Sequence, residues 1–228
     1  MNEPFSKRIW QYQRERFPVF AHGLLIAAFT FSALAYAHLC RHSVDPIPLI
    51  SFLKAYVNTF CLFLLLRISD EFKDADYDRA NRPHLPVPRG LIRLNELKYL
   101  GIALLIALVL FNLIFAPAQL LIFIFILMYL LLMFHEFFSK RWLEQHQWAY
   151  VISHMMIIPL VDTLASSFDW MQASPNLPGL YWFFAVSFFN GCTLELGRKI
   201  KATENEEANS YSSSLGFGKS LISFQAVL

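Results

Sequence analysis

Long uninterrupted runs of apolar residues dominate the chain and set its expected architecture. A helix needs roughly 20 mostly apolar residues to cross the hydrocarbon core of a bilayer, and the sequence contains six runs of about that length. These runs cover residues 17–38, 47–66, 99–115, 117–135, 148–165 and 177–195. The alternating strands of roughly 10 residues that build a membrane β-barrel are not seen in the sequence. We therefore expect an all-α fold, a polytopic helical membrane bundle with six complete spans.

The two ends of this pattern need a separate interpretation. Residues 218–228 are mostly apolar but stop after one or two helical turns, so we expect a truncated seventh span there. Ala35-Tyr36-Ala37 has the form of a signal-peptidase site after an apolar run, but the basic segment before that run is long for a signal peptide. We interpret residues 1–228 as a single transmembrane domain that lacks the last spans.

Composition and charge agree with a membrane protein. Hydrophobic residues make up 56% of the chain and charged residues 16%, whereas soluble domains carry about 25% charged residues. The three cysteines (Cys40, Cys61 and Cys192) lie in or beside apolar runs and form no CxxC pair, so we expect them to pack rather than to form disulfides or a zinc site. The expected partner is the lipid bilayer, and we expect no nucleic acid.

The positions of the basic residues predict the orientation, because Lys and Arg collect in cytoplasmic loops. If the N-terminus is inside, every Lys and Arg except Arg41 and Lys54 falls in an inside segment. The two long polar loops, 67–98 and 195–217, then face the cytoplasm as well. We expect an integral protein of the inner (plasma) membrane, with its N-terminus and both of these loops cytoplasmic.

The first of these loops begins with closely spaced acids. Glu71, Asp74 and Asp78 are three and four residues apart, which places them on one face if the segment is helical. Asp70 lies to one side of that face, and Asp76 points nearly opposite. Carboxylates stacked at the end of a membrane helix repel one another unless a cation neutralises them, and Mg²⁺ favours a few carboxylates together with substrate phosphates. The alternative is a solvated loop whose acids pair with its own arginines.

A segment rich in proline and arginine follows the acids. It supplies Arg79, Arg82 and Arg89, and three prolines stiffen it. Guanidinium groups bind phosphate through two parallel hydrogen bonds. Metal-binding acids and arginines at the membrane surface are suited to a substrate with a diphosphate head and a hydrophobic tail.

These residues resemble a known family. Asp70-Glu71-x-x-Asp74-x-x-x-Asp78 is similar to the NDxxDxxxD signature of the UbiA superfamily of intramembrane prenyltransferases, such as the 4-hydroxybenzoate polyprenyltransferases. Residues 82–90, RPHLPVPRG, resemble the RPxRPxPxG stretch that follows that signature, with Leu85 in place of a basic residue. The order of spans and motifs extends the resemblance over essentially the whole chain.

The resemblance implies a Mg²⁺-dependent prenyltransferase that moves an isoprenoid from a prenyl diphosphate to a small acceptor, aromatic or a quinone precursor. It implies Glu71, Asp74 and Asp78 as catalytic residues. The implied metal ligands are Asp70, Glu71, Asp74, Asp78 and Glu195. The implied diphosphate-binding residues are Arg79, Arg82, Arg89, Arg198 and Lys199.

The second motif of the family departs from its pattern here. Glu195 stands for the first acid of a DxxxD motif, but Arg198 and Lys199 occupy its helical face and the second acid is missing. The two cations could bind the diphosphate directly. Alternatively, the protein is a non-catalytic relative that binds a prenyl lipid, or the basic run contacts anionic lipid.

Two other functions fit the sequence less well. The DGxxAR pattern of alcohol phosphatidyltransferases is absent, because residues 67–89 contain no glycine. Cation transport would need acids within several spans, and the spans offer essentially Asp162. His154 and Asp162 share one face of the fifth span, where ionisable residues are candidates for function or for hydrogen bonds between helices.

Overall fold

The computed structural model describes residues 3–171 and 178–199, and within these ranges the chain is helical and contains no strand. Five segments are long and apolar enough to cross a membrane. They are α2 (Val19–Cys40), α3 (Leu49–Lys73), α5 (Leu94–Phe115), Pro117–Phe134, which contains α6 (Leu120–Phe134), and Gln147–Trp170, which contains α8 (Gln147–Met155) and α9 (Ile157–Trp170). The predicted all-helical membrane architecture is confirmed at this level.

The predicted sixth and seventh spans are not among the five apolar segments. The expected run 177–195 coincides with α10 (Pro178–Lys199), a long helix that is not among the five apolar ones. The expected seventh span, 218–228, lies outside the described residues. The number of spans beyond five therefore stays a prediction.

The fifth span is divided at Met156, which the sequence analysis had treated as part of one continuous helix. α8 ends at Met155 and α9 begins at Ile157. Pro159 explains the interruption, because its ring lacks an N–H and clashes with the carbonyl group four residues earlier, that of Met155. The two halves can therefore present different faces to their neighbours.

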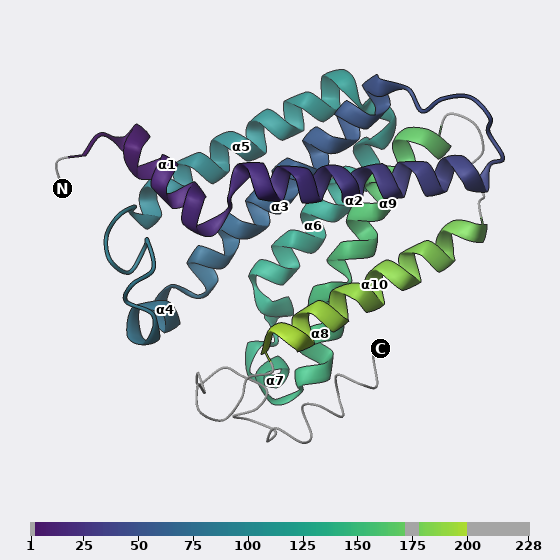
Figure 1. Cartoon of the computed structure of the whole chain (residues 1–228). Coiled ribbons are helices and arrows are strands. Elements are labelled where there is room, and N and C mark those ends of the chain that lie inside the picture. The colour runs from purple at the N-terminus through teal and green to yellow at the C-terminus, as the bar shows by residue number, and fades with distance from the viewer. Residues whose placement is uncertain (1–2, 172–177, 200–228) are drawn as a thin grey trace.

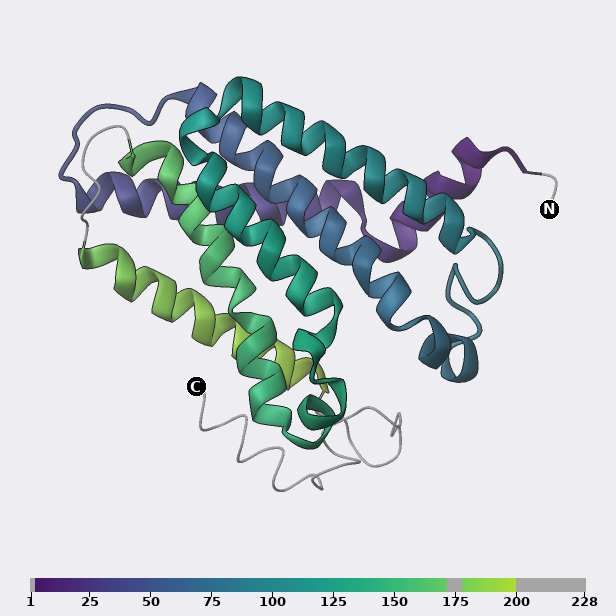
Figure 2. The same ribbon diagram turned by 180° about the vertical axis from the view of Figure 1, so that it is seen from behind.

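The helices alternate in direction, and α9 lies at the centre of the bundle (Figures 1 and 2). α9 packs against α2, α3, α6 and α10, and α5 packs against α3. Four short helices of the described residues are α1 (Phe5–Arg16), α4 (Ala75–Asn81), η2 (Glu136–Phe138) and α7 (Lys140–Gln145); a fifth, η1 (Pro117–Gln119), joins α5 to α6. All four lie at the same end of the bundle as the C-terminal ends of α3 and α10 (Figure 1).

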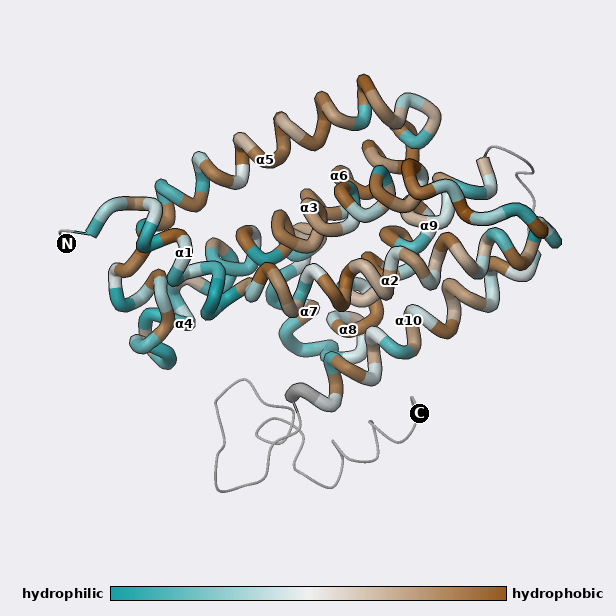
Figure 3. The backbone as a smooth tube through the Cα atoms, turned by 45° about the horizontal axis from the view of Figure 1, so that its top comes forward, coloured by the Kyte–Doolittle hydropathy of each residue, from teal (hydrophilic) through white to brown (hydrophobic). Residues whose placement is uncertain are grey.

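Hydropathy follows this arrangement. The backbone is polar around α1, α4 and α7 and apolar along α5 and α6 (Figure 3). Many large apolar side chains on the long helices are exposed, among them Phe20, Leu24, Leu121 and Phe125. A water-soluble protein rarely exposes so many, whereas these side chains would contact lipid tails in a bilayer.

Candidate functional site

The predicted acidic motif lies where α3 leaves the bundle. α3 ends at Lys73, and Asp74 has φ −93° and ψ 3°, which departs from the ψ of about −42° in an α-helix. Backbone hydrogen bonds still cross this point, from Asp74 N to Asp70 O (2.9 Å) and from Asp78 N to Asp74 O (2.8 Å). The helical spacing is thus kept, but the axis bends and the acids are divided between α3 and α4.

Glu71 points inward and is held by two arginines. Only 2% of the residue is exposed. Its Oε1 accepts hydrogen bonds from Arg67 Nη2 at 2.6 Å and Arg16 Nε at 2.7 Å, and the Tyr12 hydroxyl lies 3.4 Å away. Because Arg16 and Tyr12 belong to α1, this cluster attaches α1 to the end of α3.

Asp78 is also buried. It lies 3.5 Å from an Nη1 atom of Arg82 and 3.9 Å from Nη2 of Arg16. Burial raises the pKa of the Asp78 carboxyl, and the nearby charge of Asp74 adds to this effect. Glu71 is therefore compensated by cations from the chain itself, which is the alternative that the sequence had left open for this loop, whereas at Asp78 burial outweighs the nearby arginines.

Asp70 and Asp74 are the acids of the first motif that face outward. Asp74 is exposed, and the Asp70 side chain is 47% exposed, with its carboxylate 3.9 Å from Arg67. They are four residues apart and so lie on one face of the helix end. Both interact electrostatically with Tyr150 of α8, as does Glu195 of α10. Acids of both motifs thus act electrostatically on the same residue, although they are 121 positions or more apart in the sequence.

No group of three or more His, Cys, Asp or Glu side chains in the described part of the chain is close enough to hold a metal ion by itself. Asp70 and Asp74 nevertheless fit a Mg²⁺ ion that takes its other ligands from water and substrate phosphates, which is its usual coordination in proteins. Glu71 fits less well, since a metal would have to displace Arg16 and Arg67.

A second charged cluster, which was not predicted from the sequence as a unit, lies next to Tyr150. Glu136 lies 2.7 Å from Lys73 Nζ and 3.1 Å from His154 Nε2, and these two nitrogens are 3.3 Å apart. The Tyr150 ring stacks on His154 at 3.9 Å. Burial acts to raise the pKa of Glu136, but His154 and Lys73 outweigh it and hold the pKa at about 2.

The backbone around Glu136 is unusual. Glu136, Phe137 and Phe138 have φ values of 49°, 50° and 55°. Left-handed conformations cost roughly 1–2 kcal/mol for each residue that is not glycine, and such strain collects at functional sites. Of the cluster, the sequence had singled out His154; Lys73 lies inside the acidic motif, and Glu136 is a lone acid after an apolar run.

The arginines expected to bind diphosphate occupy different environments. Arg79 is exposed and lies 3.5 Å from Asp76. Arg89 donates two hydrogen bonds to Glu15 of α1, at 2.7 and 2.9 Å, and these hold the pKa of Glu15 below its usual value. The side chains of Arg198 and Lys199, at the end of α10, lie outside the described part.

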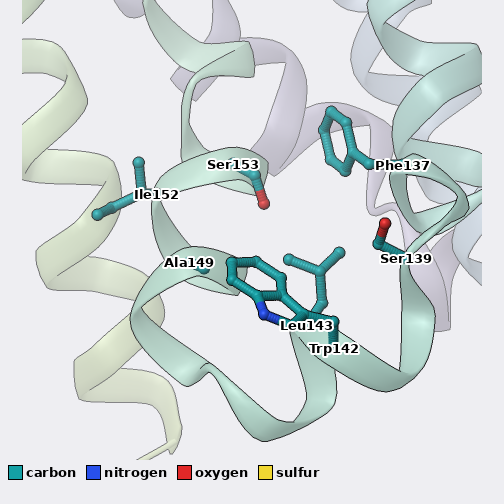
Figure 4. A pocket seen from close by; sticks show the side chains of 7 residues that line it. All are labelled: Phe137, Ser139, Trp142, Leu143, Ala149, Ile152 and Ser153. Carbon is teal, nitrogen blue, oxygen red and sulfur yellow. The ribbon is translucent and has the colours of Figure 1, made fainter.

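An apolar pocket of about 440 Å³ lies beside the strained turn. Its lining side chains come from the segment 137–143 and from α8, and Phe137, Trp142 and Leu143 project toward a common space (Figure 4). The lining residues are Phe137, Ser139, Trp142, Leu143, Ala149, Ile152 and Ser153. On its other side, the Phe137 ring contacts the His154 ring edge-on at 5.8 Å. The pocket therefore adjoins the charged cluster through Phe137 and through Ser153, whose hydroxyl lies 3.3 Å from His154 Nδ1.

Comparison with known proteins gives no match: no family model, no curated protein and no solved structure is similar to this chain. The likeness to the UbiA superfamily therefore rests on the motif residues and their order along the chain.

Proposed function

We propose that this protein is a membrane prenyltransferase, which moves an isoprenoid group from a prenyl diphosphate to a small aromatic or quinone-precursor acceptor. The observation that carries the proposal is the outward-facing pair Asp70 and Asp74 at the polar end of a membrane helix, which acts electrostatically on Tyr150 together with Glu195. Acids in this position suit a ligand whose charged head lies at the membrane surface while its tail lies among the helices.

Asp70 and Asp74 are the residues we assign to Mg²⁺. The bound ion would neutralise diphosphate as it leaves the isoprenoid carbon. Glu195, which acts electrostatically on the same Tyr150, is the third carboxylate that we assign to the metal. We assign Glu71 and Asp78 the role of holding Arg16, Arg67 and Arg82 in place, because both acids are buried against these cations.

The cations of the site supply the rest of the charge that a diphosphate needs. Arg79 is exposed near the acids, and Lys73 lies next to His154. Lys73 could turn from Glu136 to a substrate phosphate without leaving the site. The apolar helices beside the site are suited to the isoprenoid tail.

A non-catalytic protein that binds a prenyl lipid is the second candidate. It is favoured by the arginines that already neutralise Glu71, and by the missing second acid near Glu195. Such a protein would bind the isoprenoid tail without releasing diphosphate.

Diphosphate release from labelled prenyl diphosphates, in membranes containing the protein and a mixed pool of acceptors, tests the proposal. We expect release that requires Mg²⁺, stops with a chelator, and falls about 100-fold in Asp74→Asn. Asp76→Asn is the matched control, since the Asp76 side chain is fully exposed on the same segment. Prenyl-diphosphate binding without release would support the non-catalytic candidate, and neither binding nor release would refute both.

A further inference from the structure

One carboxyl lies in the middle of the bundle without a partner. Asp162 of α9 is fully buried (0% exposed), and neither of its carboxyl oxygens has a hydrogen-bond partner. It belongs to the span Gln147–Trp170, which is the most buried of the five. An acid in such a position is a candidate for function, and the prenyl transfer proposed above makes no use of it.

Charges on the helices packed against α9 do not compensate Asp162. α2, α6 and α8 carry no Lys, Arg, Asp or Glu. Their histidines are placed elsewhere: His38 contacts Asp169 and His154 contacts Glu136, while His22 stacks on Phe17. On α3, the residues from Arg67 to Lys73 lie at the end that carries the acidic motif, as does Glu195 on α10.

Among the described side chains, Lys54 is the remaining cation on a helix that contacts α9, and no ion pair in the described part of the chain joins it to Asp162. Asp169 lies on α9 itself but near its other end, where Arg41 and His38 neutralise it. The surroundings of Asp162 are therefore apolar or neutral.

One hydroxyl group lies beside Asp162, and another occupies a comparable position along α2. His38 of α2 touches Asp169 of α9, with 2.8 Å between Nδ1 and Oδ1. Thr30 precedes His38 by eight residues and Asp162 precedes Asp169 by seven, which is about 11–12 Å along either helix. Thr30 is fully buried and its hydroxyl has no partner. Ser187 of α10 lies beside the Asp162 carboxyl.

We propose that Asp162 is a proton-binding site, a carboxyl that carries its proton in the assembled bundle at neutral pH. An ionised carboxylate buried without a cation is strongly disfavoured, whereas the protonated acid is neutral. The protonated acid also gains an O–H donor, for which the hydroxyl oxygen of Ser187 is a suitable acceptor. The ligand of this site is thus a single proton and not a metal ion.

The proton links this site to the packing of the bundle. α9 contacts both α2 and α10, and the Asp162 carboxyl lies beside Ser187 of α10. Loss of the proton would place an unpaired charge among them and would require water to enter or the helices to separate. Because α10 also carries Glu195, the proton on Asp162 helps to hold that acid in position.

Infrared difference spectroscopy on the purified protein tests the proposal, with the wild type compared with Asp162→Asn at neutral pH. The wild type should show the carbonyl stretch of a protonated carboxyl, which the variant lacks and which shifts in D2O. Asp169→Asn is the matched control from the same helix: its difference spectrum should show carboxylate bands, because Asp169 is paired with Arg41. Carboxylate bands for Asp162, or bands that respond to added Na⁺, would overturn the proposal.

Thermal unfolding gives an independent readout. Asparagine imitates the neutral acid, so Asp162→Asn should unfold at the same temperature as the wild type or a higher one at neutral pH. If Asp162 were ionised and held by a cation, the substitution would leave that cation unpaired. A variant that unfolds at a clearly lower temperature, or that does not fold, would therefore also contradict the proposal.

Discussion

Glu71 is the acid of the first motif that contributes most to holding the structure together. Arg16 and Arg67 both donate to its Oε1 atom at 2.7 Å or less, and the side chain is almost fully buried. Removal of one partner from a buried ion cluster is costly because the other charges stay behind. Glu71, which the sequence predicts as a catalytic residue, is therefore expected to stabilise the fold.

Glu71→Gln should lower the free energy of unfolding by about 3 kcal/mol or more, because Arg16 and Arg67 then lose their shared anion. Asp76→Asn, at a fully exposed side chain, should change it by less than about 0.5 kcal/mol. Chemical denaturation of the purified protein in detergent compares the two. Equal stability of the two variants would show that Glu71 is not a structural anchor.

Glu136 gives a prediction for pH dependence. Its pKa in the folded protein is about 2, below the ordinary value of 4.5. An acid with a lowered pKa stabilises the fold above its ordinary pKa, and this stabilisation is lost as the pH falls toward the folded value. Wild type should therefore lose thermal stability between about pH 4.5 and pH 2 in part through Glu136.

Glu136→Gln should show a smaller loss over the same pH range, since it has no proton to gain. The measurement is the unfolding temperature of both proteins as the pH is lowered, with Glu144→Gln as a control from the neighbouring exposed segment. Parallel curves for wild type and Glu136→Gln would contradict the assignment.

For single residues, the sequence allowed part of the candidate site to be predicted. The acids of residues 70–78 could be recognised from their spacing, and Asp70 and Asp74 do face outward. Which of the acids are neutralised could not be predicted, because Arg16 comes from a segment 55 residues away from Glu71. In the same way, Glu136 meets Lys73 only because the loop after α6 folds back on α3.

At the scale of elements, α1 is bound to the site by charge. Arg8 donates to Glu96 of α5 at 2.6 and 2.8 Å, Glu15 accepts from Arg89, and Arg16 reaches Glu71. The charged residues of this segment thus contact three other parts of the chain. α1 therefore covers the acidic motif from one side.

Arg16→Ala should release α1 from the end of α3. We expect amide hydrogens of residues 5–16 to exchange with solvent at least about 10-fold faster than in the wild type, which corresponds to a loss of about 1.4 kcal/mol of local stability. Arg14→Ala is the matched control, because Arg14 is exposed on the same helix. The measurement is hydrogen exchange followed by mass spectrometry. If exchange of residues 5–16 were equally faster in both variants, α1 would not be attached through Arg16.

Breaks within helices are the second feature at this scale that periodicity did not predict. The acids were expected on one continuous helix, yet the axis bends at Asp74; the fifth span was expected to be continuous, yet it divides at Met156. Pro159 provides a local signal for the second break. For the first break the sequence offers no proline or glycine, so the bend depends on tertiary contacts such as those of Arg16 with Glu71 and Asp78.

At the scale of the whole molecule, the alternating helices place the polar short helices at one end and the loop 41–48 at the other. Arg41 is the single basic residue that the predicted orientation leaves outside. It donates to Asp169 at 2.7 and 3.0 Å and, together with His38, fastens α2 to α9. Because its charge is paired, Arg41 does not weaken the asymmetry on which the orientation rests.

Cysteine labelling tests that orientation. In a background where Cys40, Cys61 and Cys192 are replaced by alanine, single cysteines are introduced by Asp76→Cys or by Val44→Cys, both at highly exposed positions on opposite ends of the bundle. Since Lys and Arg favour the cytoplasmic side, a membrane-impermeant maleimide should label the Val44→Cys protein in intact cells. It should label the Asp76→Cys protein after permeabilisation alone.

The four combinations of labelling separate the possible topologies. The reverse pattern would place the acidic motif outside and would remove its access to cytoplasmic prenyl diphosphates, so the orientation and the proposed function would both be contradicted. Labelling of both positions in intact cells would indicate two orientations, which the charge asymmetry opposes. Labelling of neither before permeabilisation, with both labelled afterwards, would mean that the chain does not expose loop 41–48 across the membrane and would refute the five-span arrangement at its first outer loop.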